Sequence, residues 1–167
     1  QDLAPRNTYF RVLAQQGRAS EAYRHAMDLD RQTGHQDAQL GMVIADMLGH
    51  IGLHGDGLGY ASRPTQDPDL QIRQAEYQAK LAAKRNGRQS VPRLAANLVG
   101  RHQGQYNAYI AAGDLAGDNG YLDEAVHHYQ QAAELSPERE EAGIGRARIH
   151  RTRGRHAEAL QLFQAAV

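Results

Sequence analysis

The sequence predicts an all-α protein, a right-handed superhelical solenoid of about five helix-turn-helix repeats. Residues near the C-terminus recur at an offset of 34, which is the length of a helical hairpin. The 167 residues hold about five such hairpins. Aromatic residues make up only 6% of the chain, which favours thin stacked layers over a thick core. The recurring pairs are Gly120/Gly154, Glu124/Glu158, Ala125/Ala159, Tyr129/Phe163, Gln130/Gln164 and Ala132/Ala166.

In the first hundred residues or so, apolar residues recur at helical spacing between glycine and proline breaks. Gly17 marks the turn of a first, divergent hairpin. The glycine-rich run 52–59 weakens helix formation, so the helix near it should be short and irregular. The predicted elements are a hairpin over 5–33 and helices over 36–50, 56–63, 68–86 and 92–102.

The repeating part begins at about residue 105, and its spacing has a physical reason. Small residues let two helix backbones approach closely, and Tyr129 is expected to fill the space between one hairpin and the next. Gly120 and Gly154 suit helix C-termini, where a left-handed residue is common. Ser136 and Pro137 are expected to start the next helix, as its cap and its first turn.

These residues resemble the tetratricopeptide repeat (TPR) family, most clearly over 106–167 and in divergent form over 5–104. The resemblance implies one TPR-like domain over 1–167, with a possible irregularity at 52–67. It also implies a non-enzymatic scaffold that binds a protein or peptide partner and needs no cofactor. Because the chain starts without methionine and stops inside a repeat, we expect a fragment of a longer protein. The family's pattern falls on Tyr109, Ala112, Gly113, Gly120, Ala125, Tyr129, Ala132 and Pro137.

In TPR-like stacks the first helix of each hairpin lines a concave groove, and we expect the partner to bind there. Mixed charges around two isoleucines suit a docked peptide or helix. Asp114 stands where the family's set for binding C-terminal carboxylates would have asparagine, which argues against that ligand. The expected groove residues are Asn107, Ile110, Asp114, Asp118, Glu141, Ile144, Arg148 and Arg151.

The composition excludes some classes of partner and indicates the setting in which the protein works. Nineteen basic residues balance nineteen acidic ones, so no broad positive face for nucleic acid is indicated. No run of about 18 apolar residues predicts membrane insertion, and the absence of cysteine excludes disulfides. The Ala/Arg/Gly-rich composition favours a bacterial source. Bacterial TPR arrays often occur beside envelope secretion and exopolysaccharide export machinery. The resemblance therefore implies the periplasmic TPR part of an envelope secretion or exopolysaccharide export system, with the periplasm favoured over the cytoplasm.

Two other classes of function stay open. The chain could itself bind or guide a polysaccharide, cellulose-like or poly-N-acetylglucosamine, during export; sugar rings would then stack on tyrosines. A hydrolase would use His50, His54 and Asp56 around a metal, but Gly52 and Gly55 argue against the single helix that this spacing needs. The run 52–59 also invites a phosphate-loop interpretation, yet it lacks the lysine and Ser/Thr of such loops. We predict no catalytic residues, no metal and no cofactor. The tyrosines expected to lie outside the core, and therefore considered for stacking, are Tyr60, Tyr77, Tyr106 and Tyr109.

Overall fold

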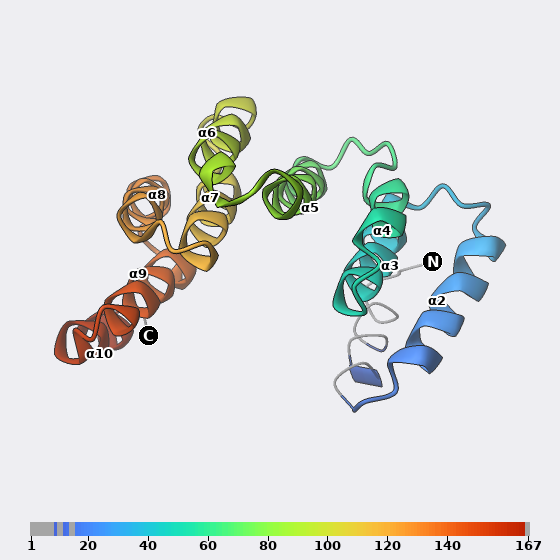
Figure 1. Cartoon of the computed structure of the whole chain (residues 1–167), viewed down its shortest axis with the longest axis horizontal. Coiled ribbons are helices and arrows are strands. Elements are labelled where there is room, and N and C mark those ends of the chain that lie inside the picture. The colour runs from blue at the N-terminus through green and yellow to red at the C-terminus, as the bar shows by residue number, and fades with distance from the viewer. Residues whose placement is uncertain (1–8, 10–11, 14–15, 166–167) are drawn as a thin grey trace. The chain divides into compact units, whose positions relative to one another are not determined.

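The computed structural model describes residues 9, 12–13 and 16–165, and over these residues all regular structure is helical (Figure 1). They form nine α-helices and one short 3-10 helix, so the predicted all-α fold is confirmed. The first helix of the hairpin predicted over 5–33 lies for the most part outside the described residues. The elements are α2 (Ala19–Gln32), α3 (Ala38–His50), α4 (His54–Ala61), α5 (Pro68–Asn86), η1 (Arg88–Ser90), α6 (Val91–Arg101), α7 (Tyr106–Asp118), α8 (Leu122–Leu135), α9 (Glu140–Thr152) and α10 (His156–Ala165).

The chain divides into two compact units, residues 1–78 and 79–167, and the boundary falls inside α5. In the first unit α3 packs closely on α4, and α2 packs on α3. In the second unit α7 pairs with α8 and α9 with α10, while α6 packs on α7 and α8 on α9. Each unit thus stacks helices that are neighbours in the sequence. The single domain expected over 1–167 stays a prediction.

The helix in the glycine-rich segment, α4, is short, with eight residues, as the sequence predicted, but it is a regular α-helix and not an irregular one. Two glycines allow helices to approach closely here. A Cβ atom on Gly57 would lie 2.1 Å from the hydroxyl oxygen of Tyr77, and one on Gly41 would lie 2.6 Å from the carbonyl oxygen of Tyr60. The Tyr77 hydroxyl donates a hydrogen bond to the carbonyl oxygen of Ala45 at 3.1 Å. Tertiary packing therefore offsets the low helix propensity of glycine.

A buried ion pair holds the first unit together. The side chain of Asp30, near the end of α2, is 0% exposed and accepts hydrogen bonds from Arg63, which follows α4. One of these bonds, to Oδ2, measures 2.9 Å. Arg63 also donates to the carbonyl oxygen of Asp37 before α3, and the Nδ1 atom of His35 lies 2.7 Å from the Asp30 carboxylate. The hydrogen bond from Arg63 is the main reason why the pKa of Asp30 lies below its ordinary value.

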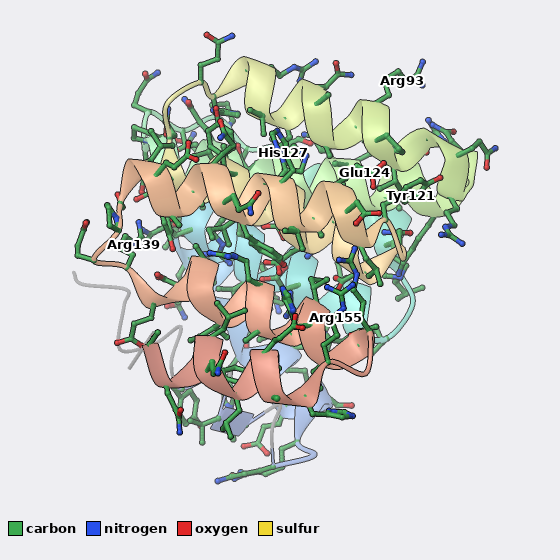
Figure 2. The ribbon with its side chains drawn as sticks, turned by 90° about the vertical axis from the view of Figure 1, so that its left-hand side faces the viewer. Arg93, Tyr121, Glu124, His127, Arg139 and Arg155 are labelled. Carbon is green, nitrogen blue, oxygen red and sulfur yellow. The ribbon has the colours of Figure 1, made fainter. Side chains whose placement is uncertain are left out.

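The turns of the second unit repeat one geometry at the 34-residue offset. Gly120 and Gly154 have φ angles of +78° and +75°, as the sequence predicted for helix C-termini. The backbone N–H of Tyr121 then donates to the carbonyl oxygen of Ala116, which closes a turn of six residues. In the next repeat, the N–H of Arg155 donates in the same way to the carbonyl oxygen of His150. Figure 2 shows Tyr121 and Arg155 at one end of the helices and Arg139 at the other, as expected for antiparallel neighbours.

The start of α9 differs from the prediction. Ser136 does not cap this helix; it follows the last residue of α8, and α9 begins only at Glu140. Arg139 N–H donates to the carbonyl oxygen of Ser136 at 3.2 Å, which makes 136–139 a β-turn. Pro137 takes the second position of that turn, where its fixed φ is favoured. The same dipeptide thus serves to end one helix and reverse the chain.

Candidate partner-binding face

The face formed by α7 and α9 joins the first helices of two successive hairpins. Three contacts along these helices show that they run parallel. Tyr106 bonds to Glu141 near their N-terminal ends, and Asp114 pairs with Arg148 further along. Towards their C-terminal ends, a Cβ atom on Gly117 would lie 3.1 Å from the side chain of Ile149. Residues 34 or so apart therefore lie side by side on this face.

The middle of the face is a three-residue network around Tyr129, which comes from α8. The Tyr129 hydroxyl donates to Asp114 Oδ1 at 2.8 Å and accepts a hydrogen bond from the Arg148 guanidinium at 2.9 Å. Arg148 also donates directly to Asp114. Burial, reinforced by the neighbouring Asp114 carboxylate, raises the pKa of Tyr129 above its ordinary value. Tyr129 stays protonated, so its hydroxyl remains a donor over the physiological pH range.

A second network closes the N-terminal end of the face. The Tyr106 hydroxyl donates to Glu141 at 3.1 Å and accepts a hydrogen bond from the backbone N–H of Ala142 at 3.0 Å. The Arg139 guanidinium lies 3.9 Å from the centre of the Tyr106 ring and bonds to Glu141. The hydrogen bond from Arg139 is the main cause of the lowered pKa of Glu141. This carboxylate is therefore already engaged within the protein.

The structure separates the eight predicted groove residues into two groups. Asp114, Arg148 and Glu141 bond to residues of the neighbouring hairpin, as described above. Ile110 packs against buried clusters that include residues of α8 and α9. Asn107 is half-buried. Asp118, Ile144 and Arg151 are exposed outside these networks, while Glu141 and Arg148 keep exposed surface although they bond to the neighbouring hairpin. The groove positions thus carry both the contact between hairpins and the surface open to a partner.

Tyr129 owes its position to two glycines, and the sequence predicted the role of only one of them. Its ring lies between the backbones of α7 and α9: a Cβ atom on Gly113 or on Gly145 would lie 2.6 Å from the ring. The signal for the Asp114–Arg148 bond was available, because opposite charges stand at equivalent positions of the two repeats. Gly145 carries no such signal, since alanine stands at the equivalent position, 111, of the preceding repeat.

Replacing Gly145 with alanine is expected to destabilise the second unit by about 1–3 kcal/mol, because the added methyl group has to displace a fully enclosed ring. Gly100 provides the matched control. It lies inside α6 with nothing within 4 Å of its added Cβ, so Gly100→Ala should stabilise the protein by up to about 1 kcal/mol. Urea denaturation followed by circular dichroism measures both. Equal effects of the two substitutions would contradict the close contact.

The structure does not form the metal site or the phosphate-binding loop that the sequence left open as alternatives. Helix α3 ends at His50 and α4 begins at His54, with Gly52 at φ +84° between them, so the two histidines do not share a helix. The Nδ1 atom of His50 bonds to the carbonyl oxygen of Asp46. In the described part of the chain, no three His, Asp or Glu side chains gather where they could hold a metal ion. Most of the run 52–59 is helix α4, not a phosphate-binding loop.

The tyrosines considered for sugar stacking are packed against the protein. Tyr106 is 7% exposed, so its placement outside the core was wrong; its side chain is buried in a cluster with Ala132 of α8 and Ala142 of α9. Tyr60, Tyr77 and Tyr109 are half-buried, and each packs against a buried cluster. Among the described helices, none combines the length and the hydropathy that a transmembrane span requires.

This arrangement of stacked helical hairpins defines an α-helical repeat protein. Residues 106–139 match the family model described as tetratricopeptide repeat, which is the hairpin of α7 and α8 with the following turn. The predicted resemblance to that family is thereby confirmed. A comparison with curated proteins found no match.

Several solved structures share the fold at low sequence identity. A MamA fragment, 41-end from Desulfovibrio magneticus RS-1, is 16% identical over 99% of this chain and 94% of its own, with a TM-score of 0.52. MamA from AMB-1 is 20% identical; the match covers 96% of this chain and 94% of the MamA chain, with a TM-score of 0.51. YrrB, described as a TPR protein with an unusual peptide-binding site, is 15% identical. The match covers 99% of this chain and 84% of the YrrB chain, with a TM-score of 0.50. These likenesses show the helical-repeat fold.

Proposed function

We propose that this protein is a non-enzymatic interaction scaffold and that the face of α7 and α9 binds a segment of a protein partner. One observation carries the proposal. The bond between Asp114 and Arg148 fixes two parallel helices side by side, and exposed side chains of both signs and an exposed isoleucine stand on the face so formed. Its support from known proteins is the fold shared with YrrB, which is described as having a peptide-binding site.

The exposed residues indicate the chemistry of the bound segment. Ile144 is 39% exposed and offers an apolar contact, while Arg151 and Asp118 stand near the C-terminal ends of the two helices. A peptide that fits places an aliphatic side chain on Ile144 and polar or charged groups beside Arg151 and Asp118. Charge placement then decides which partner binds, while the apolar contact supplies affinity. The setting in envelope or exopolysaccharide export stays a prediction from the sequence.

Substitutions at the exposed positions test this face. A displayed peptide library is selected on the wild-type chain, and the dissociation constants of the selected peptides are measured by fluorescence anisotropy. Ile144→Asp and Arg151→Glu should each weaken binding about tenfold or more, because each removes a contact and introduces an unfavourable charge. Arg93→Glu, on the exposed surface of α6, should leave binding unchanged.

Arg148 is unsuitable for this test because it supports Asp114 and Tyr129, so its loss would alter the fold of the face itself. Peptides that bind equally to wild type, Ile144→Asp and Arg151→Glu would locate the binding site elsewhere. Circular dichroism spectra of all variants show whether the helices are intact.

A further inference from the structure

Charge is separated between two consecutive segments of the second unit. Residues 79–113 contain six lysine and arginine residues and no acidic residue. Residues 114–138 contain six acidic residues and neither lysine nor arginine. The whole chain has nineteen basic and nineteen acidic residues, so this separation is a property of the second unit and not of the overall composition.

Helix α6 presents its part of the positive charge on its exposed side. Arg93 and Arg101 are exposed and lie eight residues apart, which is about 12 Å along a helix. The exposed residues between them are Ala96, Asn97 and Gly100, none of which is charged. Gly100 has nothing within 4 Å of an added Cβ atom. A second helix can therefore approach α6 closely between the two arginines.

Helix α8 presents negative charge in a similar way. Glu124 and Glu134 are exposed and lie ten residues apart, which is about 15 Å along the helix. Because α7 is joined to α6 and to α8 by short turns and packs on both, α6 and α8 each run opposite to α7 and hence in the same direction. Figure 2 shows Arg93 and Glu124, which lie in the first turns of these two helices, towards the same end. The second unit thus carries a positive and a negative helix surface with the same direction.

The charged side chains of these two helices are not paired with one another. Among the described residues, no acidic side chain forms an ion pair with Arg93 or Arg101, and no basic one does so with Glu124. Elsewhere the chain pairs exposed arginines with its own carboxylates, as it does at Arg18, Arg31, Arg73 and Arg155. The charges on α6 and α8 therefore stay open to charged groups outside the chain.

We infer that the surface formed by α6 and α8 binds a second copy of the chain around a two-fold axis, with α6 of each copy against α8 of the other. Such an axis makes α6 antiparallel to the α8 that it meets. Arg93 then faces Glu134 of the second copy, and Arg101 faces Glu124 of the second copy. The two spacings, about 12 Å and about 15 Å, are close enough for these long side chains to pair.

The separation of charge identifies the occupant as a second copy. A positive helix beside a negative one is complementary to itself after half a rotation, and the chain supplies both signs. A nucleic acid or another uniform polyanion would be attracted to α6 but repelled by α8. Single exposed ion pairs contribute little each, so we expect the dimer to be weak and sensitive to salt.

Analytical ultracentrifugation of the full chain at low ionic strength measures this association. We expect a monomer–dimer equilibrium whose dissociation constant rises about tenfold or more in high salt. Arg93→Glu and Glu134→Arg should each weaken the dimer about tenfold or more, because each substitution places like charges together at two symmetric contacts. The matched control is Arg24→Glu, an exposed position on α2 with the same change in net charge, which should dimerise like wild type.

Mixing Arg93→Glu with Glu134→Arg tests the pairing directly. In the mixed dimer the two substituted helices face each other and so do the two unsubstituted ones, so both contacts again join opposite charges. We expect the mixture to dimerise about as strongly as wild type, although neither variant does so alone.

A wild-type chain that stays monomeric at low ionic strength would overturn the inference, as would a mixture that dimerises no better than its components. Oligomers that keep growing with concentration would overturn it as well, because they require a head-to-tail contact that does not close. If circular dichroism shows that Glu134→Arg or Arg93→Glu loses helix, Arg101→Glu and Glu124→Arg form the second pair for the same mixing experiment.

Discussion

Tyr129→Ala is expected to lower the free energy of unfolding of the second unit by about 3–5 kcal/mol. The ring is 0% exposed and lies between the backbones of α7 and α9. Gly113 and Gly145, which face it, have no side chains that could move into the space left behind. The hydrogen bonds from the hydroxyl to Asp114 and from Arg148 are lost as well. Urea denaturation followed by circular dichroism measures the change, and hydrogen exchange of α7 and α9 amides assigns it to this unit.

The Tyr129→Phe variant distinguishes the contribution of the ring to stability from that of the hydroxyl group. The ring then still fills the space between the helices, and Arg148 still bonds to Asp114, so the expected loss is only about 1 kcal/mol. The alanine variant should therefore be clearly less stable than the phenylalanine variant. Similar stabilities of the two would mean that the hydroxyl network, and not the enclosed ring, holds the two hairpins together.

Asp30→Ala is expected to destabilise the first unit by about 3–5 kcal/mol. Arg63, whose side chain is 11% exposed, would be left as a nearly buried cation without its carboxylate. The link from α2 to the carbonyl oxygen of Asp37 through Arg63 would weaken at the same time. Thermal and urea denaturation of the full chain measure the loss.

Asp28 offers a matched control on the same helix. It pairs with Arg31, but both side chains are more than half exposed, so Asp28→Ala should cost less than about 1 kcal/mol. If the two aspartate substitutions had equal effects, burial would not be the source of the stabilisation by Asp30.

The contribution of Asp30 should depend on pH in a defined direction. Its pKa in the folded protein lies below the ordinary value of 3.8, chiefly because of the hydrogen bond from Arg63. The unfolded chain therefore binds the proton more readily, and stability falls as the pH drops from 3.8 through the folded pKa. Above that range the contribution is fully present. The difference in unfolding free energy between wild type and Asp30→Ala should accordingly shrink below pH 3.8, and a constant difference would contradict the assignment.

The two stabilising networks differ in how they relate to binding. Asp30 and Arg63 hold the helices of the first unit, whereas Asp114, Tyr129 and Arg148 hold two hairpins in register on the proposed binding face. Substitutions in the second network are expected to change the face and the stability together. Substitutions at the exposed Arg151 should change binding alone.

Much of the fold could be predicted because its signals are local. The 34-residue recurrence predicted the hairpins of the second unit, and the helix predicted over 68–86 has these bounds in the structure, following its Asp67–Pro68 start. Gly120 and Gly154 ended their helices as expected, since a positive φ is a property of the backbone at one residue. The helix start predicted at Ser136 and Pro137 was wrong, because the same dipeptide suits both a turn and a helix start. Only the packing of the surrounding segments decides between the two.

By itself, the sequence determined the class of fold, the period of its repeat and the helices that form the face, because helix periodicity and turn residues act over short distances. Which groove residues are open to a partner was decided only by the tertiary structure. Asp114 and Arg148 are 34 positions apart in the chain, and Asp30 and Arg63 are 33 apart; both pairs exist because folding brings them together. Whether a charged side chain binds a partner or its own neighbour depends on distances that periodicity does not contain.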